Sequence, residues 1–141
     1  MGKSLIDRTE VKVRFGEVDS MGIIWHGNYV KYLEEGRESF GGRYGISYLD
    51  IYKHDVMTPV VSLEIDYKKQ VGYGDILIIE TEYIDQEAAK ILFRYRIFRK
   101  SDGELVSTAQ SVQVFINMDR EMLYYPPPFV MEWKKKVGLI S

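Results

Sequence analysis

The chain has 141 residues, of which 45% are hydrophobic and 28% are charged. Its formal net charge of −2 gives no reason to expect nucleic acid or an acidic membrane as a partner. The absence of cysteine excludes disulfides, thiolate metal ligands and a cysteine nucleophile, and it fits a reducing compartment. The length fits one domain over residues 1–141, large enough to bury a core.

Targeting signals are not expected in this sequence. Residues 1–8 lack the apolar segment of a signal peptide, and no apolar run approaches the ~20 residues of a membrane span. We therefore expect a cytoplasmic protein without a membrane-spanning segment.

The N-terminal part of the chain predicts a strand, a loop and a long helix, in that order. Val11, Val13 and Phe15 alternate with charged residues, which is typical of a strand with one buried face. Residues 17–27 form the loop, and the helix follows from about Asn28 to Tyr44. Its buried face is expected to hold the residues that recur at three- and four-residue steps, namely Tyr29, Tyr32, Leu33, Gly36 and Phe40.

The remainder of the chain predicts mainly antiparallel strands. Glycines at positions 41, 42 and 45 end the long helix, and residues 47–52 form one further helical turn. Strands are then expected at residues 60–68, 75–84, 90–99 and 104–118. Asp102 and Gly103 are typical of a tight hairpin turn, residues 126–128 are three prolines that break regular structure, and a short helix covers residues 129–137. This order predicts an α+β domain whose sheet is covered by the long helix.

The loop before the long helix combines the groups that hydrolysis of an acyl compound requires. It holds Asp19 and His26, and Asn28 after it is a good N-cap residue. A helix N-terminus offers unpaired N–H donors and partial positive charge. A carboxylate can attack a carbonyl or activate water, and the donors can stabilise an oxyanion. On the residues alone, a turn residue is the commoner role for such an aspartate as Asp19, and a polar residue without a catalytic role is the commoner one for a lone histidine such as His26.

The same stretch resembles the signature of the hot-dog-fold acyl-CoA thioesterases. The resemblance is to the branch that contains 4-hydroxybenzoyl-CoA thioesterase and the bacterial Tol–Pal-associated thioesterases. It rests on residues 14–19, 21–26, 28–29, 33–34 and 37, with a second match at residues 58–62. It implies a hot-dog fold, in which an antiparallel sheet wraps around one central helix. It also implies a homodimer whose sheets join edge to edge, often paired into a homotetramer.

The resemblance implies specific roles for the loop residues. Asp19 falls at the position of the catalytic carboxylate, acting either as nucleophile on the thioester carbonyl or as general base on water. The backbone N–H of His26 is the implied oxyanion donor. The residues expected to contact the substrate are Gly22, Trp25, Gly27, Tyr29, Thr58 and Lys90. No dissociable cofactor is implied, because the coenzyme A thioester is the substrate, and two isolated histidines do not form a metal site.

Basic side chains are needed for the phosphates of coenzyme A. The candidates are Lys68, Lys69, Lys90, Arg94, Arg96, Arg99 and Lys100, and a solvated sheet face explains most of them as well. Because few other positive charges surround Lys90, an acyl carrier protein thioester is an alternative to coenzyme A. Glu34 and Arg37 match the motif and are spaced to form an ion pair on the helix.

The predicted function is therefore hydrolysis of an acyl thioester to free acid and thiol. One alternative is a non-catalytic module that binds acyl thioesters on the same fold, because fold and function are separable. Another is a hydratase or dehydratase of this fold, although that chemistry requires a catalytic histidine beside the α or β carbon. Aromatic, short aliphatic and long aliphatic acyl groups all remain open.

Overall fold

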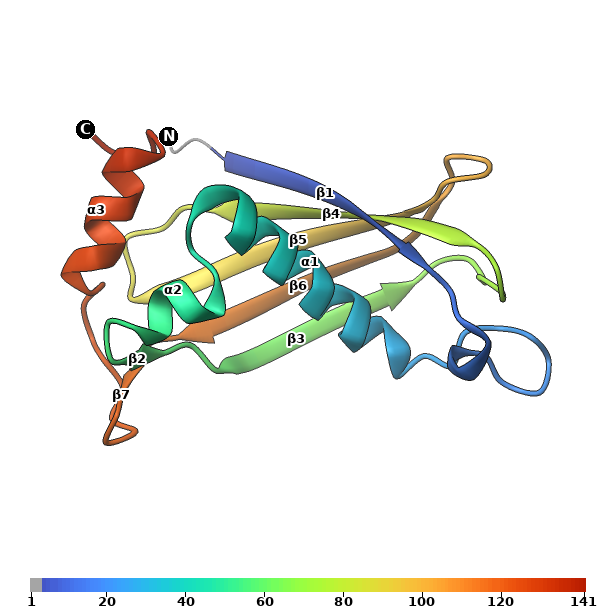
Figure 1. The fold of residues 1–141 in the computed structure, drawn as a ribbon, viewed down its shortest axis with the longest axis horizontal. Helices are drawn as coiled ribbons and strands as arrows, with labels where there is room; N and C mark the ends of the chain where they lie inside the picture. Colours follow the sequence, from blue (N-terminus) through green and yellow to red (C-terminus); the bar gives the residue numbers. More distant parts are fainter. Residues whose placement is uncertain (1–3) are drawn as a thin grey trace.

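The computed structural model describes residues 4–141 and has one main antiparallel sheet (Figure 1). The sheet has the strand order β1-β4-β5-β6-β3. Its strands are β1 (Ser4–Lys12), β3 (Val60–Tyr67), β4 (Ile76–Ile84), β5 (Lys90–Arg99) and β6 (Leu105–Val114). The long helix α1 (Asn28–Tyr44) crosses one face of this sheet, and α3 (Pro128–Lys136) lies at one end of it (Figure 1). The α+β arrangement expected from the sequence is confirmed.

Three short elements complete the chain. A 3₁₀ turn, η1 (Phe15–Glu17), follows β1, and α2 (Tyr48–Tyr52) follows α1. The side chain of Ser47 caps α2 by accepting from the Asp50 N–H, as the predicted extra turn requires. The strands β2 (Val56–Met57) and β7 (Ile116–Asn117) pair separately from the main sheet.

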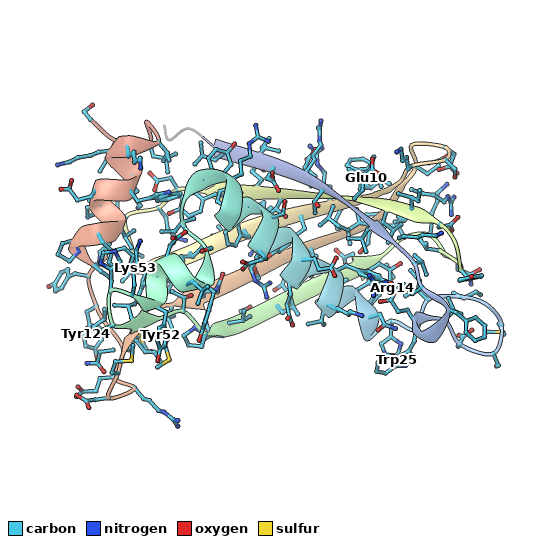
Figure 2. All side chains as sticks on the ribbon, viewed as in Figure 1. Glu10, Arg14, Trp25, Tyr52, Lys53 and Tyr124 are labelled. Carbon is cyan, nitrogen blue, oxygen red and sulfur yellow. The ribbon has the colours of Figure 1, made fainter. Side chains whose placement is uncertain are left out.

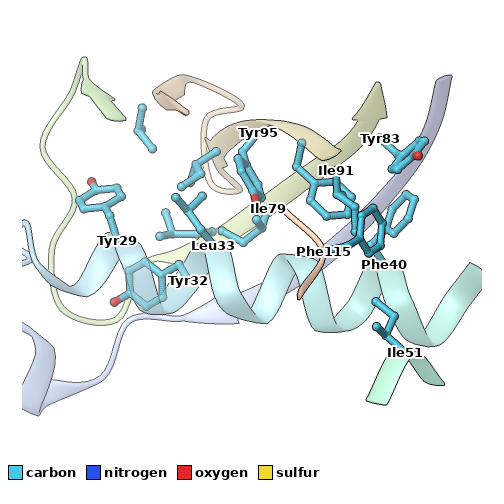
Figure 3. Packing of buried hydrophobic residues seen from close by; sticks show 14 of the residues in the cluster. Tyr29, Tyr32, Leu33, Phe40, Ile51, Ile79, Tyr83, Ile91, Tyr95 and Phe115 are labelled. Carbon is cyan, nitrogen blue, oxygen red and sulfur yellow. The ribbon is translucent and has the colours of Figure 1, made fainter. Parts of the chain in front are cut away.

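Helix α1 packs on the sheet through the predicted face. Tyr29, Tyr32, Leu33, Gly36 and Phe40 are all buried, and Figure 3 shows the row of side chains between helix and sheet. Gly36 allows this close approach, because a Cβ built there would lie 2.6 Å from Thr81 Oγ1 and 2.8 Å from Ile79 Cγ2. Gly45 ends the helix in the left-handed region, with φ of 77°.

Three predicted boundaries are wrong. The first strand starts at Ser4 and ends at Lys12, so Phe15 lies in η1 with 76% of its surface exposed. The last strand does not run from 104 to 118, because the chain leaves the sheet after Val114, buries Phe115 and pairs again with β2. Pro128 begins α3 rather than preceding it, since proline is compatible with the first turn of a helix.

The two ends of the sheet hold different segments of the chain, and we call them the loop end and the α3 end. At the loop end, the 17–27 loop bonds to the segment after β3: the Ile24 N–H donates to Val71 O at 2.8 Å, and Ile23 pairs with Gly72. At the α3 end, β3 and β5 begin, α2 lies over the sheet, and α3 lies beside the end of the sheet (Figure 1). In the part of the chain that the structure describes, no helix is long and apolar enough to cross a membrane.

Candidate active site

Glu17 anchors the loop to α1. Its buried carboxylate accepts from the Arg14 N–H at 2.8 Å, from Tyr32 Oη at 2.9 Å and from Lys31 Nζ at 2.8 Å. Burial raises the pKa of this carboxyl, but the bonds from Lys31, Arg14 and Tyr32 outweigh burial and hold the pKa below its ordinary value. Glu17 is therefore a charged group committed to structure. Its carbonyl oxygen also accepts from the Trp25 N–H and from the Asn28 side-chain amide.

Asp19 lies on the exposed part of the same loop. Its Oδ1 accepts from the Met21 N–H at 2.8 Å and from the Ile23 N–H at 3.3 Å, which forms a side-chain turn around Gly22. Gly22 has a φ of 77°, so glycine is required there by the backbone. Within residues 4–141, Asp19 Oδ2 has no hydrogen-bond partner. The turn thus fixes the carboxylate and leaves one oxygen unpaired.

The start of α1 differs in detail from the prediction. Gly27 is the N-cap, no side chain caps the helix, and Asn28 is its first residue. The predicted capping role of Asn28 is wrong because its amide donates to Glu17 O at 2.9 Å instead. In the described part of the chain, the N–H groups of His26 and Gly27 have no acceptor, whereas those of Asn28 and Tyr29 bond to the preceding turn. Two backbone donors are thus unpaired beside the helix N-terminus.

Aromatic side chains surround these donors. The ring of Trp25 packs on Gly27, where an added Cβ would lie 2.1 Å from a ring carbon. The ring centroid of His26 lies 5.2 Å from that of Trp25 and 6.3 Å from that of Tyr67. Tyr67 Oη donates to His26 O at 3.3 Å, and Tyr29 is buried beneath Tyr67 with 5.0 Å between ring centroids. Figure 2 shows Trp25 beside the start of α1, far from Tyr52 and Tyr124 at the α3 end.

The predicted site residues fall into two separate groups. Asp19, Gly22, Trp25, His26, Gly27 and Tyr29 lie together at the loop end. Thr58 precedes β3 at the α3 end, where its oxygens accept from Gln113 Nε2. Lys90 begins β5 at that same end and is exposed. One copy of the chain therefore does not bring Thr58 and Lys90 to Asp19.

Several predicted charge contacts are replaced by others. Four of the candidate phosphate-binding residues are held in ion pairs: Lys69 with Glu104, Arg96 with Glu80, Arg99 with Asp102, and Lys100 with Glu10. The expected pair of Glu34 and Arg37 does not form, because Arg37 turns towards the sheet and donates to Tyr95 Oη at 3.1 Å. Tyr95 Oη in turn bonds to Ser111 Oγ at 2.6 Å.

Two residues that shape the site were not singled out in the sequence. In the sequence, Glu17 is only one residue of the motif. Its anchoring role depends on Lys31 and Tyr32 of α1, whose side chains donate to its carboxylate. Tyr67 comes from the end of β3, and no spacing rule relates it to His26 forty-one positions earlier. Buried carboxylates and long-range aromatic contacts become visible only once the loop and strand are placed together.

Both the sheet wrapped on a helix and the loop beside the helix N-terminus are features of thioesterase-like hydrolases. The chain belongs to the Thioesterase-like superfamily, whose family model matches residues 13–134.

Known proteins similar to this chain agree with that assignment. YneP of Bacillus subtilis (strain 168), whose name proposes acyl-CoA thioesterase activity, is 33% identical over 114 residues, covering 81% of this chain and 82% of that protein. The 4-hydroxybenzoyl-CoA thioesterase of Pseudomonas sp. (strain CBS-3) is 27% identical over 118 residues, covering 79% of this chain and 84% of that protein. The structure of a DHNA-CoA thioesterase from Staphylococcus aureus aligns with a TM-score of 0.83 at 30% identity, covering 94% of this chain and 91% of that one. The expected hot-dog fold is confirmed.

Proposed function

We propose that this chain hydrolyses acyl thioesters, with coenzyme A thioesters as the first substrates to test and Asp19 as the catalytic carboxylate. The observation that carries the proposal is the unpaired Oδ2 of Asp19 on the loop that also presents the unpaired N–H groups of His26 and Gly27. The names of the relatives support coenzyme A as the thiol part of the substrate. Acyl carrier protein thioesters are the alternative.

The mechanism follows from the chemistry of these groups. The N–H of His26, and that of Gly27 beside it, donate to the thioester carbonyl oxygen and stabilise the negative charge that develops there. Asp19 either attacks the carbonyl carbon, releasing the thiol and leaving a mixed anhydride that water cleaves, or takes a proton from the attacking water. Both routes give a free acid and a thiol and return Asp19 to its carboxylate form.

A complete site requires a second copy of the chain in this proposal. Strand β3 is an edge of the sheet, and Val61 and Tyr67 on it are 59% and 51% exposed. Two copies related by a twofold axis would pair their β3 strands antiparallel. The loop end of one copy then lies beside the α3 end of the other. This arrangement would bring Thr58 of one copy towards Asp19 and His26 of its partner.

The test is a panel of acyl-CoA thioesters with release of free thiol as the readout. Turnover of at least one of them by the purified chain is expected. Binding of an acyl-CoA without any turnover would instead support the non-catalytic module. The cytoplasmic location expected from the sequence stays a prediction, which fractionation of the source cells would test.

A further inference from the structure

A cavity of about 330 Å³ lies at the α3 end, between α1, α3 and the inner face of the sheet. We call this cavity the α3 chamber. The polar side of the chamber is lined by Glu34, Arg37, Glu38, Thr58 and Gln113. Its apolar wall is formed by Tyr83, Ile91, Phe93, Phe115, Val130 and Trp133. Each of these side chains is less than a tenth exposed. Four of the six are aromatic, and the proposed catalytic steps use none of them.

We propose that the α3 chamber binds the acyl group of the substrate and selects compact aromatic acyl groups of one or two fused rings. The inference rests on the proposed thioesterase function and specifies its substrate class. The volume supports the size limit, because a cavity of about 150 Å³ is enough to bind benzene. The chamber is about twice as large, which suits two fused rings and not an extended long acyl chain.

The lining explains the preference for an aromatic ring. Aromatic pairs gain energy in edge-to-face and offset geometries beyond the burial of apolar area. The rings here already pack in this way: Tyr83 meets Trp133 edge to face at 5.2 Å and Phe93 at 5.9 Å between centroids. A flat acyl group in the chamber would lie against the edges and faces that these rings present along its apolar wall. A flexible alkyl chain would gain only the burial of its surface.

Helix α3 sets the depth of the chamber. Trp133 Nε1 donates to Tyr44 O at 2.7 Å, which fixes α3 on the end of α1. Val130 and Trp133 lie one helical turn apart on the face of α3 that closes the chamber. Because this wall is held by a hydrogen bond and by ring contacts, it limits the length of the acyl group.

The lining of the chamber extends to the β3 edge, where the partner would bind in the proposed dimer. Thr58 and Val60, which line the chamber, stand at the start of β3. The twofold pairing of β3 strands brings the Asp19 loop of the partner copy to this place. The acyl group would then occupy the α3 chamber of one copy, with its thioester carbonyl at the helix N-terminus of the other.

The test compares benzoyl-CoA, 2-naphthoyl-CoA and palmitoyl-CoA on the wild-type chain and on Val130→Phe, which reduces the chamber. We expect kcat/KM for both aromatic thioesters to exceed that for palmitoyl-CoA by at least about tenfold, the discrimination that pocket shape alone provides. In Val130→Phe the rate with 2-naphthoyl-CoA should fall at least about tenfold relative to benzoyl-CoA. Met131→Phe, on the exposed side of the same helix, is the matched control and should keep the wild-type ratio.

Palmitoyl-CoA as the best substrate, or an unchanged ratio in Val130→Phe, would overturn the proposal. If Val130→Phe shows no cooperative thermal unfolding, Val130→Ala is tested in its place. Val130→Ala should raise the ratio of 2-naphthoyl-CoA turnover to benzoyl-CoA turnover. An unchanged ratio again overturns the proposal. If no thioester is hydrolysed, the proposed function fails separately. Calorimetric titration with 2-naphthoyl-CoA then tests the chamber alone, and equal heats for wild type and Val130→Phe would reject it.

Discussion

Two carboxylates on one loop, Glu17 and Asp19, have opposite environments. Glu17 is 6% exposed and is paired with Lys31 and Tyr32. Asp19 is exposed and, within residues 4–141, is bonded only to backbone N–H groups of its own turn. Deep burial with a cation makes the first carboxylate a fixed anchor. Exposure with one oxygen unpaired is what the proposed reaction requires of the second. Their different surroundings distinguish Glu17, the structural anchor, from Asp19, the carboxylate proposed to react.

The role of Glu17 predicts a dependence of stability on pH. Because its pKa is lower in the folded chain than in the unfolded one, its contribution to stability is present above the unfolded pKa of about 4.3 and is lost as pH falls through the folded pKa. Chemical denaturation of wild type and Glu17→Gln from pH 7 to pH 3 should show a difference in unfolding free energy that shrinks below about pH 4.3.

The comparison with Glu17→Gln removes other contributions of the same sign. Burial raises the pKa of Glu80, but Arg8 and Arg96 outweigh burial and lower it, so Glu80 also loses stabilising contacts in acid. That contribution is common to both chains and cancels in the difference. A difference that stays constant from pH 7 to pH 3 would show that Glu17 is not held as a charged anchor.

In the proposed mechanism, His26 acts through its backbone N–H. Its side chain is exposed and packs beside the rings of Trp25 and Tyr67, while its N–H is unpaired in the described chain. His26→Ala should therefore lower kcat by less than about tenfold, below the 10²-fold or more that a positioned acid or base contributes. A fall of 10³-fold in thiol release, with an unchanged melting temperature, would instead assign the chemistry to the imidazole.

At the scale of the elements, α1 sets the position of the site. The helix is held on the sheet where Gly36 meets Ile79 and Thr81, and this contact fixes where its N-terminus lies. Gly42 lies on the same helix, but a Cβ there would meet nothing within 4 Å. The two glycines thus give a matched pair in which one side chain is excluded and the other is tolerated.

Gly36→Ala should destabilise the chain by about 1–3 kcal/mol, because the added methyl group overpacks a fully formed contact. Gly42→Ala should be neutral or stabilise by up to about 1 kcal/mol, since alanine is the better helix former. Urea denaturation of both variants measures the two effects. Equal effects would mean that α1 does not pack as closely on β4 as the structure shows.

The bounds of some elements can be predicted from the sequence, and those of others cannot. The bounds of α1 follow from spacing and glycine chemistry alone, and β5 follows from the alternation of Arg94 and Arg96 with buried neighbours. The end of β6 before Phe115 could not be predicted, because the apolar residues from 114 to 116 continue the pattern of a strand. In the structure, Phe115 is buried and the chain leaves the main sheet at this point. The N-cap of α1 could not be predicted either. Asn28 is a residue type that often caps helices, but here its side-chain amide donates to the carbonyl oxygen of Glu17.

At the scale of the whole molecule, the two groups of predicted site residues lie at opposite ends of the sheet. The Asp19 loop lies at one end of β3, and Thr58 with the α3 chamber lies at the other. Within one copy, the sheet holds these two groups at opposite ends of β3. A second copy paired along β3 would bring them together by symmetry, so assembly would be part of the active site.

Mixed dimers test this arrangement. Asp19→Asn removes the reacting group from one copy, and Val130→Phe blocks the chamber of the other. Dimers of the two variants, purified through two different affinity tags, should hydrolyse 2-naphthoyl-CoA at about half the wild-type rate, because one of two symmetric sites is then intact. No recovery in confirmed mixed dimers would place the catalytic loop and the chamber of a site in the same copy.

The most direct measurement compares thiol release from acyl-CoA thioesters by wild type and by Asp19→Asn. The asparagine keeps the shape of the turn but can neither form an anhydride nor take a proton from water. We predict a fall in kcat of about 10²-fold or more, with binding of the uncleaved thioester retained. Glu132→Gln, which changes an exposed carboxylate on α3 that does not line the chamber, should match wild type. Hydrolysis by Asp19→Asn at the wild-type rate would contradict the account, because Asp19 would then be only a turn residue.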